Sequence, residues 1–277
     1  MSQKTILITG CSSGIGYHAA HALAARGWHV IATCRKQEDC DQLVAEGLES
    51  LRLDYQETES ITDALVMVME LTGGRLDAVF HNGAYAMGGA IEDIPTDAWR
   101  RMFEANFFGW HELTRRVIPF MRRQGHGRIV MCSSVLGFIG ARMRGPYVST
   151  KFAVEGYADV LRLELRGTNI YPILIEPGPV TSKIRQNAQA HYELWTEKED
   201  TPWAEFYKTT LEPRLYAEDG KKDRFELGPE AVTKKLIHAL EAPRPRVRYY
   251  VTTPTYIAGY LKRIVPARWL DWVLMKG

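Results

Sequence analysis

A phenol and an ammonium group stand one helical turn apart in the segment GPYVSTKFAVEGYADVLRLEL, residues 145–165. Tyr147 and Lys151 are four residues apart, and side chains with this spacing share one face of a helix. One interpretation is structural: a half-buried tyrosine beside a lysine whose stem packs along apolar surface. The other is chemical, because a neighbouring cation stabilises a phenolate and lowers the pKa of a phenol from about 10. The spacing alone favours the structural interpretation, so the surrounding elements must decide.

The composition describes a globular chain with no sign of nucleic-acid binding. Of 277 residues, 45% are hydrophobic and 25% charged, as in proteins that bury a sizeable core, and the formal charge is only +2. The four cysteines form no CxxC pair and no histidine cluster completes a ligand set, so we expect reduced thiols and no metal site. No signal peptide and no run of about 18 apolar residues is visible, and we expect a cytoplasmic protein.

Strand and helix patterns alternate along the chain. Short apolar runs predict strands at residues 4–10, 29–34, 48–54, 75–84, 127–134, 170–178 and 246–252. Helical periodicity predicts helices at 14–27, 37–46, 57–71, 146–166 and 229–241, with 96–123 forming one long helix or a broken pair. This alternation predicts a single α/β domain over residues 1–277. Its core would be a Rossmann-like, doubly wound parallel sheet of about seven strands with helices on both faces.

The sequence TGCSSGIG, residues 9–16, joins the first predicted strand to the first predicted helix. Gly10, Gly14 and Gly16 would allow a tight turn, a close approach of backbone to a ligand, and close packing of helix on strand. The start of the helix presents free N–H groups and the positive end of its dipole to an anion. We therefore predict a phosphate-binding loop at this position.

The spacing TGxxxGIG resembles that of the short-chain dehydrogenases/reductases, closest in style to members that act on steroids, retinoids and other hydrophobic alcohols or ketones. The resemblance extends from the first strand to residues 246–251. Ser134 lies 13 residues before Tyr147, and Asn106 lies in the middle of the 96–123 segment. With Lys151 these residues resemble the Asn-Ser-Tyr-Lys tetrad of the family, which favours the chemical interpretation. Ser133 is adjacent, but on an extended strand it would point to the opposite side.

The chemistry of carbonyl reduction explains these residue types. Hydride reduction of a ketone leaves an alkoxide that needs a proton, and oxidation of an alcohol needs a base. We predict that Tyr147 is this acid/base, that Lys151 lowers its pKa, and that Ser134 hydrogen-bonds the substrate oxygen. The family resemblance further implies that Lys151 holds the nicotinamide ribose and that Asn106 holds a water linking Lys151 to solvent.

The end of the second strand indicates which dinucleotide is used. Enzymes of this fold that prefer NAD carry an acidic residue there, which accepts hydrogen bonds from the ribose 2′-hydroxyl. This chain has Cys34, followed by Arg35 and Lys36. No carboxylate would repel a 2′-phosphate, and Arg35 could pair with it, with Ser12 or Ser13 adding a hydroxyl donor. We predict NADP(H) as the cofactor, with NAD(H) less favoured.

Further positions match the family with one departure. Asp54 resembles the adenine-binding aspartate, and residues 176–182, EPGPVTS, resemble the segment that borders nicotinamide. Residues 81–84, HNGA, stand where the family has N-N-A-G, so His81 is either part of the site or only a strand-end residue. The complete predicted cofactor-binding set is Gly10, Ser12, Ser13, Gly14, Ile15, Gly16, Arg35, Asp54, Asn82, Gly83, Tyr147, Lys151, Pro177, Gly178, Val180 and Thr181.

The predicted substrate is a hydrophobic secondary alcohol or ketone, with a steroid or retinoid as the first choice. Segments 84–89 and 136–145 are mostly apolar, and residues 180–226 mix polar and aromatic side chains, which suggests a loop or lid over the site. The aromatic side chains of this lid are Tyr192, Trp195, Trp203, Phe206 and Tyr207. They could instead serve packing, and a smaller carbonyl compound or an acyl-chain substrate is the alternative.

The last segment, residues 254–277, is amphipathic. Its predicted apolar face consists of Tyr256, Ile257, Tyr260, Leu261, Ile264 and Val265, followed by Trp269, Leu270, Val273 and Leu274. We expect this face to pack on its own fold or on another subunit, with peripheral membrane contact as the alternative.

Apolar faces at 96–123 and 146–166, together with the family resemblance, predict a homodimer or homotetramer. A dinucleotide-binding sensor without turnover is a further alternative, but it would be expected to have lost the tyrosine or the lysine.

Overall fold

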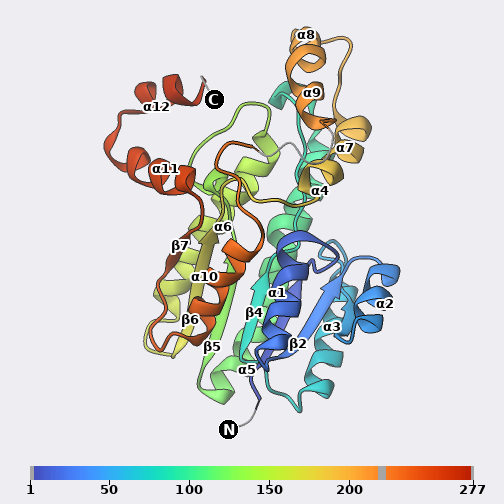
Figure 1. Ribbon diagram of the computed structural model, residues 1–277, viewed down its shortest axis with the longest axis vertical. Coiled ribbons are helices and arrows are strands. Elements are labelled where there is room, and N and C mark those ends of the chain that lie inside the picture. The colour runs from blue at the N-terminus through green and yellow to red at the C-terminus, as the bar shows by residue number, and fades with distance from the viewer. Residues whose placement is uncertain (1–2, 218–222, 276–277) are drawn as a thin grey trace.

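A computed structural model describes residues 3–217 and 223–275, which contain a seven-stranded sheet (Figure 1). Every neighbouring pair of strands in it is parallel, in the order β3-β2-β1-β4-β5-β6-β7. The strands are β1 (Thr5–Thr9), β2 (His29–Cys34), β3 (Glu49–Arg52), β4 (Ala78–His81), β5 (Gly127–Cys132), β6 (Ile170–Glu176) and β7 (Arg248–Tyr250). The predicted Rossmann-like, doubly wound parallel sheet is confirmed.

Several strands are shorter than the apolar runs from which they were predicted. β4 ends at His81 and β5 at Cys132, so residues 82–84 and 133–134 leave the sheet as loops at its carboxyl edge. The chain winds outward in both directions from β1 and β4, which makes their junction the switch point of the sheet. The residues predicted to do chemistry therefore follow strand ends at this edge.

Helices cover both faces of the sheet. Figure 1 shows α1 (Gly14–Ala25) and α10 (Glu230–Glu241) side by side in front of it. The helices behind the sheet are α3 (Thr58–Leu71), α5 (Gly109–Gln124) and α6 (Gly145–Glu164), and α2 (Gln37–Ala45) packs against β2 and β3. Their inward faces and the strands form a continuous apolar core, which includes Ile6, Leu7, Ile8, Leu23, Val79 and Val130.

The predicted 96–123 helix is a pair joined by a π-helical turn. α4 (Thr96–Phe103) leads into η2 (Glu104–Phe108), which leads directly into α5. A π turn adds a residue to a helix and often occurs at functional sites. Asn106 lies inside this turn.

Residues 180–226 are largely helical, so the prediction of a loop is wrong for most of this segment. It contains α7 (Ile184–Trp195), α8 (Ala204–Phe206), the π turn η4 (Tyr207–Leu211) and α9 (Glu212–Leu215). Tyr192 and Tyr207 are fully buried in a second apolar cluster with Met102, Ala98 and Tyr147. Their aromatic rings thus serve packing, which stabilises helices where the sequence suggested a loop. Residues 218–222 of the predicted lid lie outside the described residues.

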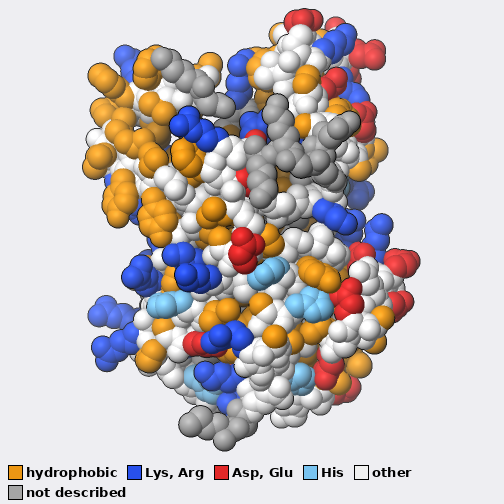
Figure 2. Space-filling view, viewed as in Figure 1, with side chains coloured by type: hydrophobic (Ala, Val, Ile, Leu, Met, Phe, Trp, Pro, Cys, Tyr) orange, Lys and Arg blue, Asp and Glu red, His pale blue; other side chains and the backbone are white. Residues whose placement is uncertain are grey.

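The C-terminal segment forms α11 (Thr253–Ile264) and α12 (Ala267–Leu274), but not with the expected side buried. Tyr260 and Ile264 are 67% and 76% exposed, whereas Ala258 and Leu270 pack on Ile139. Figure 2 shows the exposed apolar side chains gathered at the upper left, over these helices. Most of the predicted apolar face is therefore not packed on its own chain. None of the described helices has the length and apolar character needed to cross a membrane.

Two glycines lie inside helices for different reasons: one is required by close packing, and the other only weakens its helix. A Cβ on Gly16, in α1, would lie 2.3 Å from the carbonyl oxygen of Gly10, whereas a Cβ on Gly156, in α6, would meet no atom within 4 Å. We expect Gly16→Ala to lower the free energy of unfolding by about 2 kcal/mol and Gly156→Ala to raise it by about 0.5–1 kcal/mol. Urea unfolding followed by circular dichroism measures both changes, and equal effects would contradict this packing.

Candidate active site

A cleft of ≈ 1590 Å³ opens at the carboxyl edge of the sheet, over the junction of β1 and β4. Its walls come from the loops that follow β1 to β6 and from helices α7, α9 and α12. Figure 1 shows α7 and α9 at the upper right and α12 at the upper left, above the sheet. In parallel α/β sheets, this is where ligands bind.

The loop after β1 is fastened to the loop after β4. Gly10 has φ +70°, and a Cβ there would lie 2.6 Å from the Cα of Gly83. Asn82 Nδ2 donates to the carbonyl oxygens of Thr9 (3.0 Å) and Gly10 (3.1 Å). Thr9 Oγ1 in turn accepts from the backbone N–H groups of Asn82 (3.0 Å) and Gly83 (3.1 Å). The cleft is therefore bounded here mainly by backbone, as close approach of a phosphate requires.

Most of the predicted cofactor-binding residues line this cleft. They are Gly10, Ser12, Ser13, Ile15, Arg35, Asp54, Asn82, Gly83, Tyr147, Lys151, Pro177, Gly178, Val180 and Thr181. Gly14 and Gly16 are not in the lining: Gly16 packs against the Gly10 carbonyl, and Gly14 has φ +60° beside Ser182. The Thr181 hydroxyl, predicted to contact the nicotinamide amide, donates to Glu226 Oε1 at 2.6 Å.

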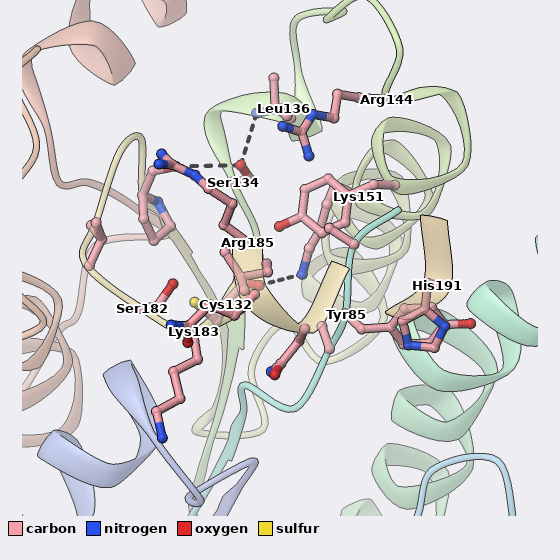
Figure 3. A pocket seen from close by; sticks show the side chains of 18 of the residues that line it. Tyr85, Cys132, Ser134, Leu136, Arg144, Lys151, Ser182, Lys183, Arg185 and His191 are labelled. Carbon is pink, nitrogen blue, oxygen red and sulfur yellow. Dashed lines mark hydrogen bonds between the residues drawn. The ribbon is translucent and has the colours of Figure 1, made fainter. Parts of the chain in front are cut away.

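Tyr147 and Lys151 are brought together, as predicted, by the first turns of α6. Both side chains are buried and line the cleft. Lys151 Nζ donates to the carbonyl oxygen of Cys132, at the end of β5 (2.8 Å; Figure 3). The same nitrogen lies 4.6 Å from the centroid of the Trp110 ring and 5.5 Å from that of Tyr147. A cation and a phenol therefore share one wall of the cleft.

Burial dominates the protonation of both groups. It lowers the pKa of Lys151 from 10.5 to about 8. Burial also raises the pKa of Tyr147, while a hydrogen bond with Ser134 and the Arg144 cation act in the opposite direction. In the structure, Ser134 and Arg144 act to lower the pKa of the phenol. The expected effect of Lys151 on that pKa stays a prediction.

Ser134 follows β5 and caps the short helix η3 (Val135–Gly137). Its Oγ accepts a hydrogen bond from the backbone N–H of Leu136 at 3.1 Å (Figure 3). Ser133 instead lies against Glu155, and its Oγ is 2.6 Å from the position that a Cβ on Gly137 would take. Of the two serines, Ser134 is the one whose hydroxyl influences Tyr147.

Asn106 is fully buried beside the cleft and does not line it. Its Oδ1 accepts from the backbone N–H of Tyr85 (3.1 Å), and its Nδ2 donates to the Tyr85 carbonyl oxygen (2.9 Å) and to Thr150 Oγ1 (3.3 Å). The side chain thus ties η2 to the loop after β4 and to the residue before Lys151. The predicted water between Asn106 and Lys151 stays a prediction.

His81, the departure from the family pattern, is a buried structural residue. Its Nδ1 is hydrogen-bonded to the Tyr55 hydroxyl (2.7 Å) and its Nε2 to Thr114 Oγ1 (2.9 Å). Its ring stacks on Trp110, with centroids 5.4 Å and planes 20° apart. Burial lowers the pKa of His81 from 6.5 to about 3. The imidazole is therefore neutral and supports the indole on which the lysine ammonium rests.

Sequence reasoning missed several residues that shape this site. Trp110 lies four residues after Asn106, and that spacing could have placed it on the same side of the helix. Tyr85 stacks on His191 at 4.0 Å between centroids, which joins the loop after β4 to α7. Arginines 144, 185 and 214 line the cleft, although the segment 136–145 was interpreted as apolar. No group of three or more His, Cys, Asp or Glu side chains in residues 3–217 and 223–275 is placed to hold a metal ion.

The fold and this cleft define a nucleotide-binding α/β enzyme, and comparison with known proteins names the class. Residues 4–193 match the family model described as short chain dehydrogenase. The chain therefore belongs to the short-chain dehydrogenase family, whose members are oxidoreductases with an NAD(P)-binding fold that act on CH–OH groups.

Its relatives include proteins with and without an assigned substrate. An uncharacterized oxidoreductase, YbbO of Escherichia coli, is 39% identical over 272 residues, 98% of this chain and 94% of the relative. Human retinol dehydrogenase 8 is 31% identical over 88% of this chain and 80% of its own length. Human 17-beta-hydroxysteroid dehydrogenase type 1 is 29% identical over 91% and 78%. The crystal structure of a short-chain dehydrogenase from Streptomyces avermitilis matches with a TM-score of 0.77 and 27% identity, over 99% of this chain and 98% of that one.

The neutral, buried His81 should make stability depend on pH. With a folded pKa of about 3 against 6.5, the unfolded chain binds a proton between these values that the folded protein does not. This residue should therefore lower the free energy of unfolding as pH falls below 6.5, by about 1.4 kcal/mol per pH unit. Asparagine, the residue usual in the family, does not titrate. Between pH 7 and pH 5 we expect His81→Asn to lose about 2 kcal/mol less than the wild type. Urea unfolding at both pH values checks this, and parallel losses would contradict it.

Proposed function

We propose that this protein is an NADP(H)-dependent oxidoreductase that transfers a hydride between nicotinamide and a hydrophobic secondary alcohol or ketone, with Tyr147 as the acid/base. The observation that carries the proposal is the burial of Tyr147 and Lys151 together in the wall of the cleft that also contains the glycine loop. A dinucleotide-binding sensor would have no need of this pair.

The residues at the phosphate loop fit a dinucleotide. A Cβ on Gly10 would collide with the backbone of Gly83. The loop can therefore keep this tight path, close to a bound ligand, only because residue 10 is a glycine. The first turn of α1 carries no acidic side chain, and the Ser12 and Ser13 side chains line the cleft before it. Hydroxyl groups and N–H groups at a helix N-terminus are the donors that a pyrophosphate requires.

Each member of the tetrad has a separate part in the proposed reaction. The bound nicotinamide would supply or accept the hydride. Tyr147 gives its phenolic proton to the carbonyl oxygen in reduction and takes the proton of the alcohol in oxidation. Ser134 donates a hydrogen bond to the same oxygen, and Lys151 stabilises the phenolate and holds the ribose hydroxyls. Asn106 keeps α6 and η2 in register and holds the water that connects Lys151 to solvent.

The proton transfer is tested by removing one hydroxyl. We expect Tyr147→Phe to lower kcat by about 10³-fold while the Kd for NADPH stays within about threefold, because the ring and its packing remain. Tyr157→Phe is the matched control, since Tyr157 lies on the same helix and its hydroxyl is hydrogen-bonded to His111 (3.2 Å), away from the proposed reaction. Stopped-flow absorbance and fluorescence titration give the two quantities. Full turnover by Tyr147→Phe would end the assignment.

The preference for NADP(H) rests on the residues that follow β2. Cys34 is buried, and Arg35 is exposed and lines the cleft. Asp39 is the nearest acidic residue along the chain in that lining, and it lies in the first turn of α2. A relative named NADPH-dependent 3-dehydrocapnine reductase is 27% identical over 98% of this chain, which supports the same cofactor here.

Arg35→Ala should change cofactor choice. We expect kcat/KM for NADPH to fall by about ten- to a hundredfold, the usual worth of a charge-assisted hydrogen bond, with little change for NADH. Arg52→Ala is the control, because Arg52 pairs with Cys34 across β2 and β3 but its side chain bonds Glu57 (2.8 Å). Initial rates with both cofactors provide the measurement. Equal use of the two by the wild type, unaffected by Arg35→Ala, would defeat the preference.

The proposed substrate is lipophilic. Apolar side chains that include Leu136, Ile139, Met143, Leu211 and Leu215 line the cleft near Tyr147. Relatives named retinol dehydrogenase 8 and 17-beta-hydroxysteroid dehydrogenase type 1 support a retinoid- or steroid-like compound. Of the five aromatic residues predicted to form the wall, only Phe206 lines the cleft. An acyl-chain or smaller carbonyl substrate is the second candidate.

A homodimer or homotetramer is the proposed assembly. Phe108, Phe152, Val160 and Leu163, on η2 and α6, are exposed, and the apolar face of α11 is exposed as well. Apolar side chains gathered on helix faces favour association with a second copy. The cytoplasmic location expected from the sequence stays a prediction.

A further inference from the structure

Three of the arginines that line the cleft, Arg144, Arg185 and Arg214, lie beside its apolar lining. Arg144 is the N-cap of α6, and Arg185 and Arg214 come from α7 and α9. Figure 3 shows the guanidinium groups of Arg144 and Arg185 near Ser134 and Leu136, while Lys183 extends the other way. The arginines thus lie at the substrate end of the cleft.

These three arginines have fewer carboxylate partners than guanidinium groups. Asp223 Oδ2 accepts from Arg185 (2.9 Å) and from Arg214 (3.4 Å). Glu226, also in the cleft lining, is bonded to the Thr181 hydroxyl (2.6 Å) and to the backbone N–H of Asp223 (2.8 Å). Among the described residues, one carboxylate therefore serves two guanidinium groups and a third has none.

Arg144 is the guanidinium without a counter-ion. It is half-buried, and no hydrogen bond or ion pair joins its side chain to another described residue. Burial, followed by the Arg214 cation, lowers its pKa, whereas Tyr147 and Asp223 act to raise it without bonding its side chain. A desolvated cation without a bonded anion costs free energy, so this site would be stabilised by an anionic ligand that pairs with Arg144.

The backbone fixes this arginine in place. Arg144 forms a bridge with Gly89, and the Gly89 N–H donates to the Met143 carbonyl oxygen (3.1 Å). Met143 has φ +61°, which side-chain-bearing residues rarely adopt. Strain of this kind persists only where the surroundings enforce it, and it gathers at ligand sites. These contacts hold the backbone of Arg144 in place. Its guanidinium group is close enough to the Tyr147 phenol to act on the pKa of that group.

We infer that the substrate carries a carboxylate close to its reacting carbon, which pairs with Arg144, and an apolar chain that lies against Ile139, Leu211 and Leu215. This inference rests on the proposed function and narrows it to oxo acids and hydroxy acids. A guanidinium fork fits a carboxylate through two parallel hydrogen bonds. In reduction, the hydride goes to the carbonyl carbon and the Tyr147 proton to its oxygen, so the oxo acid becomes a hydroxy acid with its carboxylate unchanged.

The test compares γ-oxodecanoate with its methyl ester, which has the same reacting carbonyl but no charge. We expect the wild type, with NADPH, to show a kcat/KM at least tenfold higher for the acid. Arg144→Gln should reduce this acid-to-ester ratio at least tenfold, and Arg144→Lys should restore part of it. The ratio isolates charge recognition, because an effect of Arg144 on Tyr147 would change both substrates equally. Arg142→Gln is the control, since Arg142 stacks on Phe206 (4.2 Å to the ring centroid) and should leave the ratio unchanged.

A binding measurement separates this inference from the proposed function. Calorimetry with decanoate and methyl decanoate gives affinities without turnover, and we expect decanoate to bind at least tenfold more tightly in an Arg144-dependent manner. If neither oxo compound is reduced but this difference holds, the proposed function fails and the carboxylate site stands. If the ester is reduced or bound as well as the acid, or if Arg144→Gln affects both equally, the inference is overturned while the oxidoreductase assignment survives.

Discussion

The burial of one ammonium group constrains the whole site. Lys151 is almost fully enclosed, and a lysine in such a place is tolerated only where an acceptor and an electron-rich surface replace water. The Cys132 carbonyl provides the acceptor at 2.8 Å, and the Trp110 ring provides the surface at 4.6 Å. Both depend on distant parts of the chain, because Cys132 ends β5 and Trp110 lies in the first turn of α5. The buried lysine therefore requires the end of β5 and the start of α5 to lie against α6 in one arrangement.

The supports of that lysine extend well beyond the residues predicted for catalysis. Trp110 donates to the Gly83 carbonyl (2.9 Å) and stacks on His81, so the last residue of β4 and the loop after it both hold the indole. Asn106 holds the same loop through Tyr85. The cleft thus has a rigid floor built from the sheet edge, whereas its upper walls are built from the helices that follow β6 and β7.

Much of the fold could be predicted because its signals are local. The strand at residues 4–10 and the glycines at 10, 14 and 16 carry their own pattern, and alternation of strands and helices then restricts the topology. The positions of Asn106, Ser134, Tyr147 and Lys151 came from family resemblance, since spacing alone favoured a structural role for the last two. Their meeting at one cleft follows from the parallel sheet, which brings strand ends to a common edge.

The rest depended on long-range contacts that a sequence does not display. Tyr192 and Tyr207 were predicted to belong to an aromatic loop or lid, but both are fully buried in one apolar cluster. The pKa of Tyr147 is raised because burial exceeds the neighbouring charges, and burial is known only after folding. His81 was ambiguous for the same reason: its two hydrogen-bond partners lie 26 and 33 residues away.

The π turn at Glu104–Phe108 restricts which insertions and deletions this chain can tolerate. Each residue of an α-helix turns the chain by about 100°, so the extra residue in η2 sets the angular phase of everything that follows in α5. Deleting one residue there would give a more regular helix, yet it would rotate the indole away from its ammonium partner. Insertions and deletions in this stretch are therefore forbidden by geometry even where every side chain is kept.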